Sequence, residues 1–322
     1  KGTLPREQAG RNIHYDDASL ANYKKVEQGD FIIHLRSFEG GLEMANEDGI
    51  VSPAYTILRC KKPHSSLFYE AYFHTDEFIN HILSKSVEGI RDGRQISYEA
   101  FKWLGLPYCD VSEQERIAQL FCTLSHRIEK QQQMVDALKK YKRGLIKLVF
   151  EKVMSEAHYQ LPLSDLCISI SSGRTTVNES NGRYPLFGST GIVGMTNTIE
   201  HDGDIVMVAR VGANAGKVNF FSGRCGVTDN TLVIRVKENT IHPKFLAYFL
   251  ENFDLHKLIF GSGQPLVTGG QLKKIQSPVI AYKAQLLITR SLESLDRIIG
   301  TQDTYMEKLI QLKSGLMQRL FI

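Results

Sequence analysis

The sequence predicts an α+β protein in which two tandem β-rich domains are each followed by a long helix, so that the chain is an internal two-fold repeat. Three observations predict this class. Two long stretches carry apolar residues at alternating spacings of three and four, which is typical of a helix packed against another helix. Short β-rich runs bounded by glycine precede each stretch. The motifs also recur in the same order, about 171–176 residues apart.

The long helices are predicted from a row of apolar residues spaced alternately three and four apart, which we call the seam and which occurs twice. Adding 171 to each position of the first copy yields the second, and a glutamine and a lysine interrupt both copies at the same points. One seam alone would also fit an ordinary amphipathic core helix. However, no proline lies between Pro107 and Pro162, and roughly 40 helical residues would span about 60 Å at 1.5 Å per residue. We therefore expect two long helices that pair as an antiparallel coiled coil, with the polar seam residues fixing their register. The predicted pairing residues are Leu124, Ile128, Gln131, Val135, Leu138 and Leu145 in the first helix, and Leu295, Ile299, Gln302, Met306, Leu309 and Leu316 in the second.

The globular parts repeat as well. Each contains two β-rich runs and then a short amphipathic helix. These segments are Asp30–Arg36, Gly49–Arg59 and Phe68–Leu83 in the first part, and Asp204–Arg210, Gly226–Arg235 and Pro243–Ile259 in the second. The first part lacks a counterpart of Leu161–Ser172, which indicates that it is N-terminally incomplete. The predicted boundaries are 1–109 for the first β-rich domain, 110–157 for the central spacer helix, 158–279 for the second domain and 280–322 for the distal helix.

The composition is that of a soluble globular protein, with 42% hydrophobic and 23% charged residues. No apolar run reaches the roughly 18 residues of a membrane-spanning helix, and the first residues lack the apolar core of a signal peptide. The five cysteines are widely spaced without a metal-binding pattern. We therefore expect buried free thiols in a reducing cytoplasm. The net charge of +4 permits nucleic-acid binding without requiring it.

Nothing in the sequence predicts catalysis. The stretch GANAGKV at Gly212–Val218 is not a phosphate loop, because three residues separate its glycines and a valine replaces the Mg²⁺-binding hydroxyl. It fits the turn of a β-hairpin. The stretch SPAY at Ser52–Tyr55 lacks the first polar residue and the second proline of the amino-methyltransferase tetrapeptide. We therefore predict no catalytic residue, no metal ligand and no cofactor in this chain.

For a chain that binds DNA, the candidate contacts are loops rich in Arg, Lys, Asn, Gln, Ser and Gly. Base edges are read by bidentate Arg, Asn or Gln, and phosphates by Lys, Arg, hydroxyls and backbone N–H groups. An ordinary solvated loop is the alternative for each. Arg94 and Gln264 rank highest, because each follows a glycine at the same point of the two repeats, whereas the aligned pair Arg36 and Arg210 favours a structural or phosphate-binding role. The predicted DNA-binding residues are Arg36, Ser37, Arg91, Arg94, Gln95 and Ser97 in the first domain, and Ser172, Arg174, Thr175, Arg183, Ser189, Thr190, Arg210, Asn214, Lys217, Ser262 and Gln264 in the second.

With these motifs the chain resembles the specificity subunits of type I restriction-modification systems, the HsdS family. The second half carries the resemblance in LPLSDLCISISSGRTT, GDIVMVARVGANAGKV and GSGQPLVTGGQLKKIQSPV. The first half carries it in GDFIIHLRSFEGG, GIVSPAYTILR and GRQISYEAFKWLGLPYCDVSEQERI. Each motif alone is loose, but their order, twice over and each time ending in a long helix, is specific.

The resemblance implies two target-recognition domains that read the two halves of a split site in double-stranded DNA. It implies two methyltransferase subunits and restriction subunits as partners, which dock on the helices and on exposed apolar residues near their ends. S-adenosylmethionine, ATP and Mg²⁺ would be bound by those partners. Two alternatives stay open: a coiled-coil scaffold that joins two protein-binding domains without DNA, and an enzyme with its own methyltransferase or nuclease site.

Overall fold

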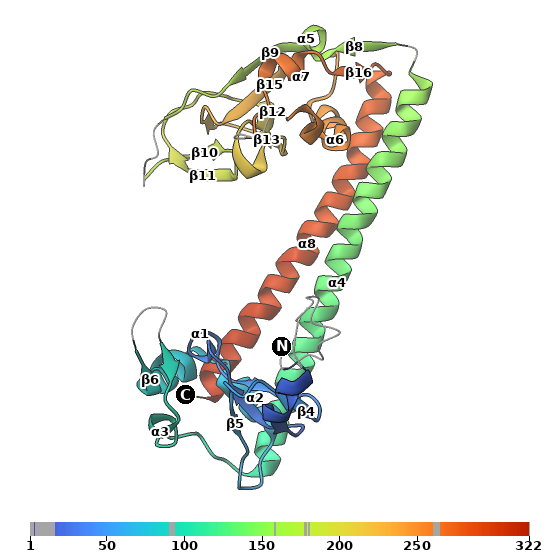
Figure 1. Ribbon diagram of the computed structural model, residues 1–322. Helices are drawn as coiled ribbons and strands as arrows, with labels where there is room; N and C mark the ends of the chain where they lie inside the picture. Colours follow the sequence, from blue (N-terminus) through green and yellow to red (C-terminus); the bar gives the residue numbers. More distant parts are fainter. Residues whose placement is uncertain are drawn as a thin grey trace. The chain divides into compact units, whose positions relative to one another are not determined.

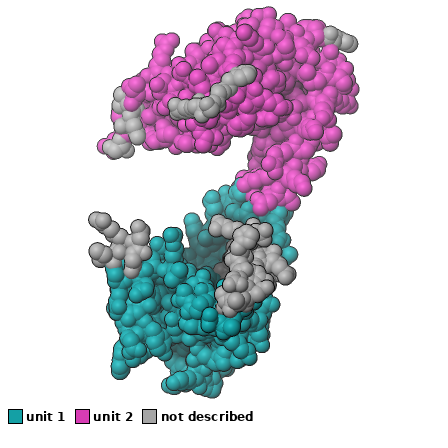
Figure 2. All heavy atoms as spheres, viewed as in Figure 1, with its two compact units in different colours: residues 1–134, 303–322 teal, residues 135–302 magenta. Residues whose placement is uncertain are grey.

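The computed structural model describes residues 3, 17–89, 94–157, 159–176, 179, 181–259 and 265–321. The chain divides into two compact units, which Figure 2 shows in different colours. Unit 1 contains residues 1–134 and 303–322, and unit 2 contains residues 135–302. Each unit therefore combines one globular part with one stretch of each long helix.

Unit 1 is built from short strands and helices around an aromatic core and a smaller aliphatic cluster. Its elements are η2 (Asp17–Asn22), β1 (Lys24–Val26), β2 (Phe31–Ile33), α1 (Ser37–Gly40), β3 (Glu43–Met44), β4 (Gly49–Val51), β5 (Thr56–Leu58), α2 (Ser66–Phe73), η3 (Glu77–Ile82), η4 (Leu83–Ser86), β6 (Val87–Glu88), β7 (Gln95–Ile96) and α3 (Tyr98–Phe101). The main sheet has the strand order β3-β2-β5, and β1 pairs with β4 and β6 with β7. All these pairings are antiparallel.

Helix α2 connects this sheet to the rest of the unit 1 core. The side chain of Ser65 caps its first turn by accepting a hydrogen bond from the Phe68 backbone N–H. The helix buries Phe68, Tyr69, Tyr72 and Phe73, residues that recur at the spacing of one helical face. Its aromatic rings pack against a β2 phenylalanine and a phenylalanine near the chain's C-terminus.

Unit 2 is a larger β-structure covered by helices. Its elements are β8 (Gln160–Pro162), α5 (Leu163–Leu166), β9 (Cys167–Ser172), β10 (Tyr184–Gly188), β11 (Gly191–Thr196), β12 (Asp204–Ala209), η6 (Gly212–Asn214), β13 (Val218–Ser222), β14 (Gly226–Val227), β15 (Thr231–Val236), α6 (Pro243–Phe253), η7 (Leu255–Leu258), α7 (Gly269–Lys273) and β16 (Gln276–Pro278). The main sheet has the order β13-β12-β15-β9, whose strands are labelled in Figure 1, and a smaller sheet has the order β11-β10-β14.

Strand β12 is apolar along nearly its whole length because both of its faces are covered. Val206 and Val208 pack in the cluster that contains the buried residues of α6. Ile205 and Met207 point to the other face and pack against residues of β10 and β14. A strand buried on both faces has no polar alternation. The predicted hairpin is confirmed, since β12 and β13 pair antiparallel around the η6 turn.

The two long helices are α4 (Val111–Glu156) and α8 (Tyr282–Leu320). In unit 2, Lys142 Nζ lies 2.7 Å from Asp296 Oδ1, and α4 residues nearer its C-terminus share a core cluster with Leu292. In unit 1, Lys313 Nζ donates to Ser125 Oγ at 2.8 Å, and the rings of Phe121 and Phe321 stack with centroids 5.7 Å apart. Partner numbers therefore rise on α8 as they fall on α4, so the predicted antiparallel pairing is confirmed within each unit.

All twelve predicted pairing residues lie on the less exposed side of these helices. Gln131, Val135, Leu295, Ile299 and Leu309 are buried. The other seven are half-buried, namely Leu124, Ile128, Leu138, Leu145, Gln302, Met306 and Leu316. The mixed α+β class with two long helices is confirmed.

A buried glutamine links each long helix to its globular part in the same way. Gln114 Oε1 accepts from the N–H of Ser65, which precedes α2, and its Nε2 donates to the Cys109 carbonyl. Gln285, which lies 171 positions later, accepts from the N–H of His242, which precedes α6, and donates to the Ile280 carbonyl. The repeat thus extends from the sequence to individual hydrogen bonds.

Two expectations about composition are tested by the structure. No helix within the described ranges is both long enough and apolar enough to cross a membrane. The five cysteines are free, but they are not all buried as expected: Cys167 and Cys225 are buried, Cys109 is half-buried, and Cys60 and Cys122 are exposed. Cys122 is exposed because it follows the buried Phe121 directly and so lies off the pairing face of α4.

Candidate nucleic-acid interface

One end of the unit 2 sheets gathers four turns. Strands β9 and β12 end there and β13 and β15 begin there, because Ser172 pairs with Leu232, Ala209 with Thr231, and Val208 with Val218. The β10–β11 turn joins them, since the Thr228 N–H donates to the Phe187 carbonyl at 2.8 Å. We call this set the loop edge, and it comprises residues 172–176, 188–191, 210–217 and 228–230.

The loop edge brings together most of the predicted DNA-binding residues of the second domain. Arg174, Thr190 and Lys217 are exposed there, and Ser172, Ser189, Arg210 and Asn214 are half-exposed. Among the described residues, the cationic side chains of Arg174, Arg210 and Lys217 form no ion pair. Such cations, together with hydroxyl and amide groups, are the chemistry that contacts phosphates and base edges.

The turn from 210 to 217 is held firmly by backbone hydrogen bonds. The Arg210 N–H donates to the Asn230 carbonyl and its own carbonyl accepts from the Val267 N–H, both at 2.9 Å. The Gly212 N–H donates to the Pro265 carbonyl at 3.2 Å. Gly212 and Gly216 adopt φ values of 77° and 87°, a region that favours glycine. The cationic side chains of this turn therefore extend from an ordered backbone.

Two predicted contacts are corrected by the structure, because their hydroxyls are used inside the protein. Thr175 is only 5% exposed, and its Oγ1 donates to Glu200 Oε2 at 2.7 Å. Ser37 is fully buried, and its Oγ accepts from the His34 N–H at 2.9 Å. Neither hydroxyl faces solvent, so both residues shape their loops and are removed from the predicted contact set.

Some predictions lie away from the loop edge or outside the described residues. Arg183 is exposed, but it precedes β10 and so lies at the end of the β10–β11 hairpin opposite its turn. Arg91, Ser262 and Gln264 fall outside the described residues.

In unit 1 the remaining candidates gather near α1. Arg36 is exposed directly before this helix. The guanidinium of Arg94 lies over the ring of Phe38 at 4.6 Å and 3.9 Å from a Glu39 oxygen, so it is partly engaged within the protein. Gln95 is exposed in β7, and Ser97 is half-buried, donating from its N–H to the Ser86 carbonyl. Of the two described arginine candidates in unit 1, Arg94 is thus packed against Phe38 and Glu39, whereas Arg36 is exposed.

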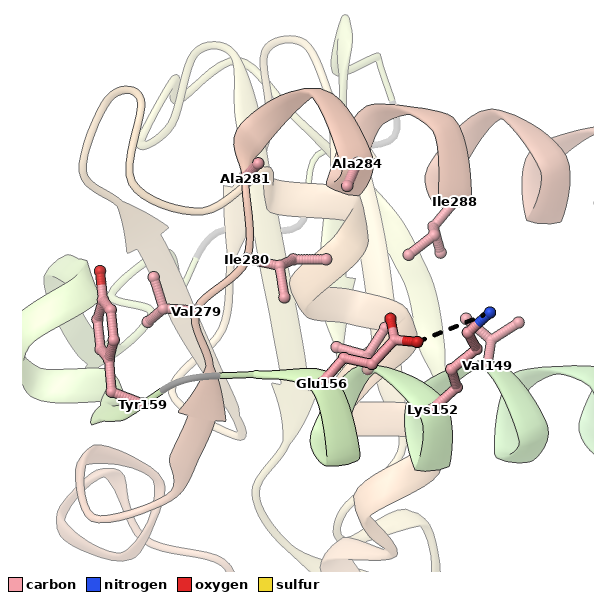
Figure 3. A pocket seen from close by; sticks show the side chains of 10 residues that line it. Val149, Lys152, Glu156, Tyr159, Val279, Ile280, Ala281, Ala284 and Ile288 are labelled. Atoms are coloured by element: carbon pink, nitrogen blue, oxygen red, sulfur yellow. Dashed lines mark ion pairs between the residues drawn. The ribbon is translucent and has the colours of Figure 1, made fainter.

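A second candidate site is an apolar pocket of 740 Å³ in unit 2, between the last turns of α4 and the first turns of α8 (Figure 3). Its walls carry Val149, Ile280, Ala284 and Ile288, and the ion pair between Lys152 and Glu156 lies at its rim. Leu148 and Leu287 on the same helices are each more than half exposed. Exposed apolar groups beside a pocket are typical of a protein-binding surface.

Sequence reasoning missed Glu200, which together with Gly173 organises the loop at 172–176. Glu200 accepts hydrogen bonds from the backbone of Arg174 and Thr175. A Cβ on Gly173 would lie 2.3 Å from the Val227 carbonyl oxygen. The glycine directly after a β-rich run was a usable signal for a close approach, whereas nothing local marks Glu200.

The model of the family described as "Type I restriction modification DNA specificity domain" matches residues 160–309. Among curated relatives, the type I restriction enzyme EcoprrI specificity subunit of Escherichia coli is 28% identical over 123 residues, which cover 38% of this chain and 30% of that protein. The putative MjaX specificity subunit of Methanocaldococcus jannaschii is 33% identical over 98 residues, 29% of this chain and 23% of that protein. The matches thus span less than a third of those relatives' lengths.

The fold is shared with solved structures over most of the chain. The type I restriction-modification S subunit from M. genitalium aligns over 93% of this chain and 84% of its own, with a TM-score of 0.65 and 14% identity. A chain from a structure of type I R-M complex assembly and conformational transition aligns over 92% and 83%, with a TM-score of 0.58 and 17% identity. The chain therefore resembles type I restriction modification DNA specificity domains in sequence over residues 160–309, and it shares its fold with the solved S subunit.

Proposed function

We propose that this chain is the DNA-recognition subunit of a type I restriction-modification complex and reads a bipartite target in double-stranded DNA. The observation that carries the proposal is the loop edge of unit 2. Cations and amide or hydroxyl side chains from three separate turns meet there on an ordered backbone. The antiparallel strand order brings them together, although they are up to about 45 residues apart in the chain.

The internal repeat supports a second reader in unit 1. Strands β2 and β5 pair antiparallel as β12 and β15 do, and the buried glutamines Gln114 and Gln285 make matching bonds. We propose that Arg36, Arg94, Gln95 and Ser97 contribute to reading the other half-site. Half-site spacing then follows from protein geometry, as in other two-part DNA readers.

The chain's partners follow from the same proposal. We propose that modification subunits, in two copies, dock on the paired helices, with the apolar pocket between α4 and α8 as one contact. Restriction subunits join the complex through them. Adenine methylation needs the base flipped from the duplex, and we assign this chemistry, with S-adenosylmethionine, ATP and Mg²⁺, to those subunits. The role of this chain is to place their active sites on DNA, as a non-catalytic subunit in the cytoplasm.

The test is to co-express the chain with the modification subunit encoded beside it and to map methylated adenines across the host genome by single-molecule sequencing. We expect one split motif, with two short specified halves around a fixed gap. Replacing residues 161–278 with those of a relative should change one half and leave the other unchanged. Co-purification of the two subunits without any methylated motif would contradict the proposal and favour a scaffold without DNA readout.

A further inference from the structure

The carboxylate of Glu200 is the centre of a hydrogen-bond network beneath the loop edge. Its Oε1 accepts from the Arg174 N–H at 2.9 Å. Its Oε2 accepts from Thr175 Oγ1 at 2.7 Å, from the Thr175 N–H at 3.1 Å and from the Val227 N–H at 3.3 Å. One side chain thus joins the loop after β9 to strand β14.

The network holds an ionised carboxylate in a largely enclosed place. The Glu200 side chain is 16% exposed. Burial raises its pKa, but hydrogen bonds from Thr175 Oγ1 and from the N–H groups of Arg174 and Val227, together with the charge interaction with the neighbouring His201, outweigh burial and lower the pKa below its usual value. A carboxylate has lone pairs for all of these donors, whereas an amide would present its NH₂ group to some of them.

Close packing at two glycines also fixes the position of the 173–176 loop against β14. A Cβ on Gly173 would lie 2.3 Å from the Val227 carbonyl oxygen, and a Cβ on Gly226 would lie 2.9 Å from Thr175 Cγ2. Contacts below 3.0 Å require a neighbouring atom to shift, and at Gly173 those neighbours are backbone atoms. The backbone at Arg174 is therefore anchored on both sides, while its side chain is exposed.

We propose that Glu200 is a positioning residue for DNA recognition by unit 2: it holds the 173–176 loop so that Arg174 is presented to DNA. This inference rests on the proposed function. Glu200 does not touch DNA itself, because its side chain is largely enclosed and both of its oxygens already accept hydrogen bonds within the protein. Its effect is to order Arg174 before binding, which lowers the entropy cost of forming the contact.

The test uses the full chain in complex with its modification subunit and a pool of random-sequence duplexes. After selection, affinities for the enriched duplex and for an unrelated duplex are measured by fluorescence anisotropy. On charge alone, Glu200→Gln should tighten binding to both duplexes. We expect it to weaken binding to the enriched duplex by about tenfold, similar to Arg174→Ala, since one base or phosphate contact is worth about that much, while binding to the unrelated duplex stays equal or tightens.

The control is Glu238→Gln, which removes the same charge from an exposed turn of unit 2 and should not weaken binding. The double variant Glu200→Gln/Arg174→Ala should bind no more weakly than Arg174→Ala alone, because the two residues act through one contact. If Glu200→Gln lowers the thermal unfolding midpoint, the variant Thr175→Val is measured in its place. It removes one hydroxyl of the network and should weaken binding to the enriched duplex by about threefold.

The outcomes separate the two proposals. If the wild-type complex enriches no sequence, the proposed function fails and this inference falls with it. If the wild type enriches a split motif but Glu200→Gln binds it as tightly as Glu238→Gln does, only the positioning role is overturned. Additive losses in the double variant would overturn it as well.

Discussion

Gln285 shows how one buried polar side chain attaches a globular part to a spacer helix. It is 1% exposed, and it bonds the His242 N–H at 2.7 Å and the carbonyls of Ile280 and Thr240 at 3.0 and 3.3 Å. These groups belong to the segments that precede α6 and α8. These hydrogen bonds from the Gln285 side chain satisfy backbone N–H and carbonyl groups that would otherwise bind water.

Replacing Gln285 with leucine should destabilise unit 2 by about 2–4 kcal/mol, because buried donors and acceptors would lose their partners. Amide hydrogen exchange of α6 and thermal unfolding measure the effect. Gln311→Leu, at an exposed position of the same helix, is the control and should change stability by less than about 0.5 kcal/mol. Equal effects of the two variants would contradict the structural role.

Asp30 should make the stability of unit 1 fall at acidic pH. Its two oxygens accept from Arg59 Nε at 2.7 Å and Nη2 at 2.6 Å, and these bonds lower the pKa of Asp30 below its usual 3.8 despite burial. The unfolded chain therefore takes up this proton at a higher pH than the folded chain does. The stabilisation is complete above about pH 4 and is lost as the pH falls through the lower, folded pKa.

Asp30→Asn should accordingly lower the thermal unfolding midpoint of unit 1 at pH 7. Below about pH 4, the difference between the midpoints of the variant and the wild type should become smaller. The measurement is thermal unfolding from pH 7 to pH 3. Glu47→Gln, at an exposed position of unit 1, should follow the wild-type profile. A gap that stays constant down to pH 3 would show that Asp30 is not the titrating group.

At the scale of elements, the two long helices use different polar contacts at equivalent places. In unit 2, Lys142 approaches Asp296 at 2.7 Å and Glu251 at 3.5 Å, and Tyr248 also donates to Asp296. In unit 1, the equivalent Lys313 donates to a serine. The acceptor of Lys142 is a charged carboxylate, whereas the acceptor of Lys313 is a neutral hydroxyl. The two halves of the helix pair therefore differ chemically, and this difference favours a single register.

A double-mutant cycle with Lys142→Ala and Asp296→Ala should give a coupling of about 1–2 kcal/mol, because the pair is charged and partly buried. The cycle with Lys313→Ala and Ser125→Ala should give about 0.5 kcal/mol, because the serine carries no charge. Chemical unfolding of the four single and two double variants provides both values. A larger coupling for the serine pair would contradict this assignment.

At the scale of the whole molecule, DNA binding should depend steeply on salt. Each phosphate contact that is lost should reduce the slope of log affinity against log salt by about 0.9. The triple variant Arg174→Ala/Arg210→Ala/Lys217→Ala should therefore lower the slope by up to about 2.7 if all three contact phosphates. Lys140→Ala, on the exposed side of α4, should leave it unchanged. An unchanged slope in the triple variant would place DNA elsewhere than the loop edge.

The sequence by itself determined the α+β class, the two long helices and the repeat. The periodic seam and the order of glycine-bounded runs are local patterns, and they report which face of a helix or strand is buried. The same locality explains why the β12–β13 hairpin was predictable, since its turn and both strands are contiguous.

Only the tertiary structure decided which loops share an edge and which polar residues face solvent. Strand pairing joins Ser172 to Leu232 and Ala209 to Thr231, and no local pattern encodes that choice. Ser37 and Thr175 looked like DNA contacts because their hydroxyls suit phosphates, yet both bond inside the protein. Glu200 gave no sequence signal at all, because its role depends on donors that the fold brings to it from distant positions in the chain.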